Sequence, residues 1–197
     1  TLPPSFLLGT ATASAQIEGA TTVGGRTNSV WDRFSAQPGR ILDGTTTAVT
    51  ADHYHRVAED VKLMAELGSN AYRFSLGWTR LQPEGKGPLA PDGVSFYDQL
   101  LDELHKANIA PFATIFHWDL PEEYENGWLS RDTAARLGDF AALLGERFGD
   151  RIDHWITINE PATVTLNGYA LGLHAPGEAL LFDALPTVHH QLLGHGL

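Results

Sequence analysis

Hydrophobic and polar positions follow two different periods along the chain, and they predict strands that alternate with helices. Runs of β-branched, small apolar and aromatic residues indicate buried strands at 6–15, 70–76, 110–116 and 155–160. Apolar residues spaced by three and four indicate amphipathic helices at 52–67, 95–108, 132–148 and 182–197. The intervening segments include three predicted loops, at 20–50, 82–93 and 168–177.

The regular alternation predicts βαβ units and an α/β fold with a parallel sheet. Phe74, Thr114 and Thr157 lie at the middle of successive predicted strands, 40 and 43 residues apart. No Gly-rich dinucleotide fingerprint follows any of these strands, so a doubly wound sheet is the less favoured arrangement.

Polar side chains follow each predicted strand at or near its carboxyl end. They are Gln16 and Glu18, then Arg73, then His117-Trp118-Asp119, and finally Asn159-Glu160. In parallel sheets and barrels these ends meet on one side of the sheet, so the four clusters predict a shared pocket. Arg73 interrupts an apolar strand, and a buried arginine is expected to have an anionic partner.

Glu160 lies where a buried strand stops, because Pro161 cannot donate a hydrogen bond to a strand ladder. A carboxyl group beside apolar surface stays protonated to higher pH, which suits a general acid. The alternative interpretation is a capping or salt-bridged glutamate in an ordinary loop.

Composition and charge exclude several partners. Lys plus Arg number 13 and Asp plus Glu number 24, giving a formal net charge of -11. This charge argues against binding to nucleic acid and to an anionic membrane surface. The sequence has no cysteine, which excludes disulfides and thiolate chemistry. No apolar run is long enough to span a bilayer.

Neither a metal site nor a signal peptide is predicted. His53 and His55 are spaced by two, which places them on different faces of a helix and argues against a shared metal ion. The apolar run 6–15 lacks a basic flank, so a cytoplasmic location is expected, although the sequence starts at Thr1 and a leader could have been removed.

Several motifs occur in a specific order, and together they resemble glycoside hydrolase family 1, the β-glucosidase family of retaining exo-acting enzymes. The motifs are Gln16-Ile17-Glu18-Gly19, Asp52-His53-Tyr54-His55-Arg56 with Glu59-Asp60-Val61, Tyr72-Arg73-Phe74-Ser75, His117-Trp118-Asp119-Leu120-Pro121, Ile158-Asn159-Glu160-Pro161, Gly168-Tyr169 and His174-Ala175-Pro176-Gly177. The resemblance covers nearly the whole chain.

The resemblance implies a role for each candidate residue. Glu160 would be the general acid/base, and Asn159 would bond the sugar hydroxyl next to the reacting carbon. Gln16 and His117 would bond hydroxyls farther round the ring, with Trp118 beside them. Arg73 would support the carboxylate nucleophile electrostatically. The implied substrate is a small β-glycoside or oligosaccharide, with neither cofactor nor metal; such chemistry needs a proton donor and a second carboxylate.

The sequence departs from the family pattern in two respects. Ala162, Leu8, Thr79 and Asn126 replace the usual Trp, Trp, Pro and Gly, which puts the leaving-group preference in question. The second respect is length: the sequence has 197 residues, whereas a (β/α)8 TIM barrel typically needs ~250 residues. Residues 1–197 are therefore expected to form the amino-terminal half of one barrel, without the nucleophile segment.

An isolated half-barrel is expected to leave the inward faces of Phe74, Thr114 and Ile158 uncovered. Residues 1–197 alone are therefore expected to be either poorly folded or paired, with themselves or with a complementary half, and not to hydrolyse glycosides. Two other functions stay open. One is a non-catalytic half-barrel that binds sugar or a partner chain. The other is an unrelated lyase or aldolase, which is disfavoured because Lys62, Lys86 and Lys106 fall in predicted helices or loops rather than at strand ends.

Overall fold

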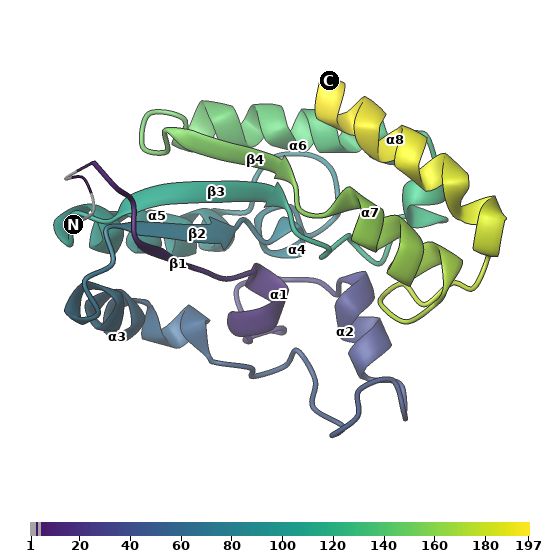
Figure 1. The fold of residues 1–197 in the computed structure, drawn as a ribbon, viewed down its shortest axis with the longest axis horizontal. Helices are drawn as coiled ribbons and strands as arrows, with labels where there is room; N and C mark the ends of the chain where they lie inside the picture. Colours follow the sequence, from purple (N-terminus) through teal and green to yellow (C-terminus); the bar gives the residue numbers. More distant parts are fainter. Residues whose placement is uncertain (1–2, 4) are drawn as a thin grey trace.

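A parallel four-stranded sheet, in the order β1-β2-β3-β4, forms the centre of the computed structural model, which describes residue 3 and residues 5–197 (Figure 1). The strands are β1 (Gly9–Ala11), β2 (Ala71–Ser75), β3 (Ala110–Phe116) and β4 (His154–Ile158). Because sequential strands are spatial neighbours and all run in the same direction, each connection carries a helix across one face of the sheet.

Four longer helices follow the strands: α3 (His53–Glu66), α5 (Pro91–Lys106), α6 (Asp132–Phe148) and α8 (Leu185–Gly196). The shorter helices are α1 (Ser14–Ile17), α2 (Val30–Ser35), α4 (Trp78–Leu81) and α7 (Pro161–Thr163). Three further turns of helix are 3₁₀ at Gly127–Leu129 and Leu181–Ala184 and π-helical at Val164–Ala170. No helix within the described part of the chain is long and apolar enough to cross a membrane.

The hydrophobic core lies between the sheet and the helices α5 and α6, which lie behind the sheet in Figure 1. Phe74 of β2 stacks on Tyr97 of α5 with ring centroids 6.4 Å apart, and Trp78 stacks on Phe140 of α6 at 4.8 Å. Each large apolar side chain buried in this layer contributes roughly 1.5–3 kcal/mol to folding. This layer therefore holds the strand ends in fixed relative positions.

The expectation that Phe74 faces the barrel interior is wrong. Strand side chains alternate between faces, and the register pairs Phe74 with Ala113 but Arg73 with Phe112. Phe74 therefore lies on the helix-covered face, opposite Arg73.

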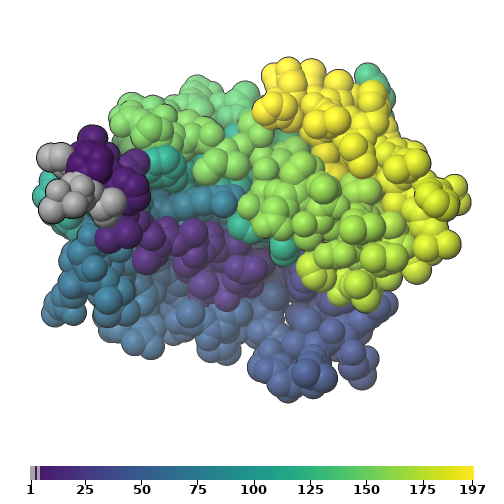
Figure 2. Space-filling view, in the orientation of Figure 1, coloured from purple at the N-terminus to yellow at the C-terminus, as the bar shows by residue number. Residues whose placement is uncertain are grey.

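No helix formed by the described residues covers the other face of the sheet. By register it carries Arg73, Phe112, Thr114, Ile156 and Ile158, so Thr114 and Ile158 lie on the predicted inward face. Three apolar side chains there, those of Phe112, Ile156 and Ile158, are only half-buried. Figure 2 shows β2 and β3 at the bottom of a hollow, with β1 and α1 on one side and β4 on the other.

The first predicted strand is shorter than 6–15. Among the residues that the structure describes, Gly9–Ala11 alone pairs with β2, and Phe6, Leu7 and Leu8 are about half exposed. Gly9 is required here, because a Cβ at this position would lie 2.4 Å from the carbonyl oxygen of Ala71. The chain then turns into α1, so Gln16 lies on a short helix after the strand.

Two predicted loops contain helices that periodicity did not reveal. The segment 20–50 includes α2, whose start is fixed by a capping box between Ser29 and Asp32. The segment 168–177 overlaps the π-helical turn at Val164–Ala170.

The ends of three predicted helices also shift. The helix α5 begins at Pro91, earlier than predicted, because proline fits the first helical turn. The helix predicted at 182–197 is divided between the 3₁₀ turn and α8. The helix predicted at 52–67 is confirmed as α3 to within one residue at each end, and α6 has the predicted bounds.

Candidate active site

Asn159 and Glu160 follow β4 and lie next to the end of β3. The backbone N–H of Asn159 donates to the carbonyl of Phe116 at 2.9 Å, which extends the pairing of β3 and β4 beyond the last strand residue. Glu160 has φ of 47°, a left-handed conformation that non-glycine residues rarely adopt and that costs of order 1–3 kcal/mol. Such strain is typical of functional positions, and here it turns the chain into α7.

The Glu160 side chain is exposed in this structure. Its carboxylate Oε2 accepts a hydrogen bond from Thr163 Oγ1 at 2.9 Å. The Glu160 carboxyl lacks the expected apolar surroundings among the residues that the structure describes, 3 and 5–197. The predicted position of Glu160 at the end of a strand is correct, and the described residues leave its side chain exposed.

Arg73 binds an amide rather than the anionic partner that was expected. Its Nη2 donates to Asn159 Oδ1 at 2.6 Å, and its Nε donates to Thr114 Oγ1 at 3.1 Å. Among the described residues Arg73 forms no salt bridge. The bond engages the amide oxygen of Asn159, so the amide nitrogen is the group left to donate to a ligand.

His117 lies beside these residues as a neutral base. Burial, followed by the positive charge of Arg73, lowers the pKa of His117 to about 4, while the Glu160 carboxylate acts in the opposite direction. The imidazole is therefore neutral at pH 7 and can both donate and accept a hydrogen bond. Its Nδ1 is buried and has no hydrogen-bond partner among the described residues. A buried ring nitrogen without a partner is uncommon in folded proteins, and it marks His117 as a candidate functional residue.

Trp118 supports the end of β4 through its indole nitrogen. Nε1 donates to the backbone carbonyl of Asn159 at 3.0 Å. The indole ring also stacks on Trp31, with centroids 6.3 Å apart, and contacts His174 at 5.6 Å. The sequence motif predicts Trp118 beside the sugar, but the bond from its N–H group to Asn159 could not be predicted from the sequence.

The structure therefore joins four of the predicted residues through direct bonds or close charges: Arg73, His117, Trp118 and Asn159. Glu160 extends from the same strand end. Gln16 lies on α1 with an exposed side chain, and within the described chain this side chain forms no hydrogen bond to the others. Its placement depends on the contacts that hold α1.

A second group of buried polar residues, apart from the predicted contacts, surrounds α1. Glu18 forms a buried salt bridge with Arg80 at 2.8 Å and accepts a hydrogen bond from Tyr97, while Asp119 accepts one from Ser14. Burial raises the pKa of Tyr97 well above its ordinary value, and the Glu18 carboxylate raises it further. Glu18 belongs to the motif around Gln16, and Asp119 belongs to the motif around His117. The partners of these carboxylates are far away in the sequence.

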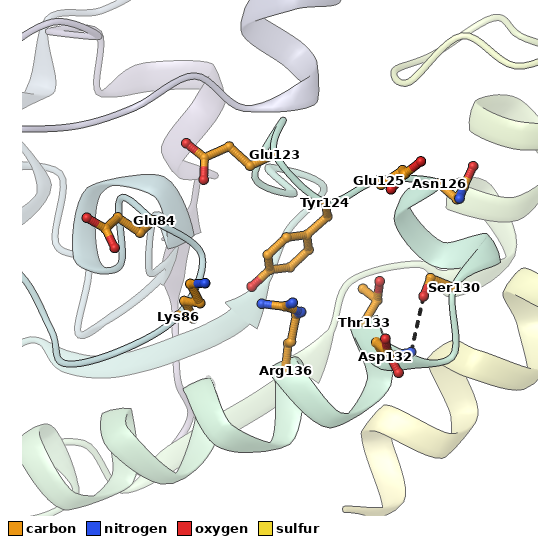
Figure 3. Close-up of a pocket in the computed structure, with 10 residues that line it drawn as sticks. All are labelled: Glu84, Lys86, Glu123, Tyr124, Glu125, Asn126, Ser130, Asp132, Thr133 and Arg136. Atoms are coloured by element: carbon orange, nitrogen blue, oxygen red, sulfur yellow. Dashed lines mark hydrogen bonds between the residues drawn. The ribbon is translucent and has the colours of Figure 1, made fainter.

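A separate cavity of about 360 Å³ opens beside the start of α6 (Figure 3). Arg136 points from α6 toward Tyr124, with its guanidinium carbon 4.8 Å from the ring centroid, and Lys86 approaches from the loop before α5. None of the predicted site residues lines this cavity. We therefore place the candidate active site at the strand ends and not in this cavity.

The sequence model for glycosyl hydrolase family 1 matches residues 1–197. The chain therefore belongs to glycosyl hydrolase family 1, as the motifs indicated.

Named relatives agree with this assignment. The chain is 45% identical to a 1,4-beta-D-glucan glucohydrolase from Thermotoga neapolitana, over 98% of this chain and 46% of that protein. It is 48% identical to thermostable beta-glucosidase B from Thermobispora bispora, over 99% of this chain and 41% of that protein. A solved beta-glucosidase from Thermotoga maritima in complex with glucoimidazole superimposes with a TM-score of 0.95 at 43% identity, over 98% of this chain and 44% of that one.

The fold class predicted from the sequence is confirmed by the likeness to this solved structure: the four β/α units belong to a (β/α)8 TIM barrel. The chain spans less than half the length of the relatives that it matches.

Proposed function

We propose that the protein is a β-glucosidase-type retaining glycoside hydrolase that removes a terminal, non-reducing β-D-glucosyl or related residue. In this proposal Glu160 protonates the leaving oxygen, and Asn159 donates its amide N–H to the hydroxyl beside the reacting carbon. Gln16 and His117 bond hydroxyls farther round the ring. The substrate is a small β-glycoside or an oligosaccharide such as those derived from β-glucan, which the name of the Thermotoga neapolitana relative suggests.

The observation that supports the proposal most strongly is the bond from Arg73 to Asn159. It links the middle of β2 to the end of β4, two positions that are 86 residues apart in the sequence, and leaves the Asn159 amide nitrogen free to donate. Beside it lies a neutral His117 with a buried, unpaired ring nitrogen. A neutral amide and a neutral imidazole side by side fit the hydroxyls of a sugar better than they fit a charged ligand.

Retention of configuration requires a second carboxylate about 5–5.5 Å from the acid/base. We propose that this nucleophile comes from a further segment or a partner chain that completes the barrel, and that Arg73 supports it electrostatically. We also propose a cytoplasmic location for the protein.

The test is an assay of the intact protein with a chromogenic aryl β-glucoside and with a β-linked disaccharide, combined with NMR detection of the anomer released first. The β-anomer is the expected first product. Release of the α-anomer would exclude a retaining mechanism. Sugar binding without turnover would favour the alternative function, a non-catalytic sugar-binding half-barrel.

We expect that Gln16→Ala and His117→Ala each reduce kcat/KM of the intact protein by about 10-fold or more. Buried hydrogen bonds to a sugar strengthen as the transition state forms, and truncation removes one of them in each variant. Steady-state kinetics on an aryl β-glucoside would measure the effect. Wild-type kinetics in both variants would show that the sugar pocket is misplaced.

The substitution Trp118→Phe should lower kcat/KM by about fivefold, because the Asn159 carbonyl loses one hydrogen bond worth about 1 kcal/mol. Trp31→Phe provides the matched control, since Trp31 contacts Trp118 only by stacking and should change kcat/KM by less than about twofold. Equal losses in both variants would show that the aromatic contact, and not the indole N–H, accounts for the effect.

A further inference from the structure

Asp119 is a buried carboxylate that the proposed chemistry does not use. It is 1% exposed and lies two positions after His117. Its Oδ2 accepts hydrogen bonds from Ser14 Oγ and from the backbone N–H of Trp78, both at 3.0 Å. Its Oδ1 is buried and has no hydrogen-bond partner in the described part of the chain. One oxygen atom thus makes all the side-chain bonds of this residue.

These bonds connect three neighbouring strand ends. Ser14 is the first residue of α1, Trp78 is the first residue of α4 after β2, and Asp119 follows β3. Ser75, the last residue of β2, adds to the connection: its Oγ accepts from the Ser14 N–H at 2.7 Å and donates to Ser14 Oγ at 3.0 Å. Asp119 therefore lies at the point where the ends of β1, β2 and β3 converge.

The helix α1 depends on these contacts for its orientation. It has only four residues, and its N-cap residue Ala13 provides no side-chain hydrogen bond. So short a helix gains little stability from its own backbone bonds. The bonds from Ser14 to Asp119 and Ser75 instead fix its start, two positions before Gln16.

The stability of the fold does not account for a charge at this position. Burial raises the pKa of Asp119 from 3.8 to about 6, the bonds from Ser14 and Trp78 act in the opposite direction, and the Glu18 carboxylate raises the pKa further. When the pKa of a carboxyl is higher in the folded state than in the unfolded state, its contribution to stability is complete at pH values below the unfolded-state pKa. That contribution is lost as the pH rises through the folded-state pKa. At neutral pH the ionised Asp119 therefore works against folding.

We propose that Asp119 is a positioning residue, which holds α1 against the ends of β2 and β3 so that Gln16 and His117 reach the same sugar ring. This inference rests on the proposed function. Asp119 itself is buried, and its side-chain bonds reach Ser14 and the Trp78 N–H, so its effect on the reaction passes through α1 and Gln16.

The decisive experiment is a double-mutant cycle between Asp119 and Gln16 in the intact protein. Asp119→Ala should lower kcat/KM by about tenfold, mainly through a higher KM. Adding Asp119→Ala to Gln16→Ala should cost less than about twofold more, because the contact that Asp119 positions is already missing. Asp119→Asn should restore most of the loss, because its amide oxygen can take the place of Oδ2. Additive losses, or an Asn variant as impaired as the Ala variant, would overturn the proposal.

The matched control is Asp98→Ala, which removes a carboxylate of α5 that binds Arg147 and Arg151 on the outer surface. It should leave kcat/KM unchanged and be additive with Gln16→Ala. If Asp119→Ala does not fold, Ser14→Ala removes the same contact from the other side and should show the same coupling.

A readout that needs no turnover separates this proposal from the proposed function. Hydrogen exchange should become at least tenfold faster at the amides of residues 16–18 in Asp119→Ala and Ser14→Ala, and stay unchanged in Asp98→Ala. An intact protein that shows this change but does not hydrolyse glucosides would contradict the proposed function alone. Unchanged exchange in both variants would overturn the positioning role, whatever the activity.

Discussion

Glu160→Gln in the intact protein should lower kcat/KM for substrates with poor leaving groups by about 10²–10⁴-fold, the range typical of a lost general acid. Glutamine cannot donate a proton to the leaving oxygen. An activated aryl glucoside needs little protonation to leave, so its cleavage should fall far less. A series of aryl β-glucosides with leaving groups of increasing acidity would measure the effect as the slope of log kcat/KM against leaving-group acidity.

The matched control is Thr163→Val, which removes the hydroxyl that bonds Glu160 Oε2 while the carboxyl itself stays in place. It should change the slope of that series only slightly. Equal losses in Glu160→Gln for good and poor leaving groups would show that Glu160 is not the acid/base. Neither substitution needs a change in the left-handed backbone conformation at position 160. Thermal unfolding of the two variants would show any loss of folding.

Regular elements with long, amphipathic repeats could be predicted from the sequence. The helix α6 has the predicted bounds, because its apolar residues form one stripe along the helix and all of them are buried: Leu137, Phe140, Leu144 and Phe148. The strands β2, β3 and β4 were found from their β-branched and aromatic residues. The first strand was overestimated, since the apolar residues Phe6, Leu7 and Leu8 remain exposed. Apolar character alone does not show which residues pair with a neighbouring strand.

The positions of the site residues were predicted better than their bonds. Each strand end could be located by a polar cluster, and the parallel sheet brings these ends together. The partner of Arg73, in contrast, is decided by register: Arg73 lies on the same face as Thr114, and its guanidinium reaches past β3 to Asn159 at the end of β4. A buried arginine predicts a partner with oxygen atoms, but sequence spacing cannot distinguish an amide from a carboxylate.

The face of Phe74 was predicted wrongly for a related reason. A strand that is buried on both faces shows no alternation of polar and apolar residues, so its inward face cannot be identified from the sequence. Only Arg73 breaks the pattern of β2, and it marks the open face, so Phe74 has to lie on the opposite one. The capping box of α2 was visible as Ser29 and Asp32 in the sequence, but a helix of six residues is too short to show periodicity.

We expect that a polypeptide consisting of residues 1–197 alone does not hydrolyse aryl glucosides and associates in solution. In the described part of the chain, β1 and β4 each pair on one side only, and Phe112, Ile156 and Ile158 are only half-buried on the face that no helix covers. Open strand edges beside apolar surface favour association. Light scattering should therefore give a mass above 21.4 kDa for the purified polypeptide.

The inner face can be tested directly by placing a charge on it. Ile156→Lys should reduce the association of residues 1–197, because a lysine at the centre of that face opposes contact between apolar surfaces. Leu63→Lys is the matched control, since Leu63 is already 54% exposed on α3 and should leave the mass unchanged. A complementary segment supplied in trans should compete with self-association and restore hydrolysis. A compact and active monomer of residues 1–197 would contradict the prediction and would mean that one of its own carboxylates serves as the nucleophile.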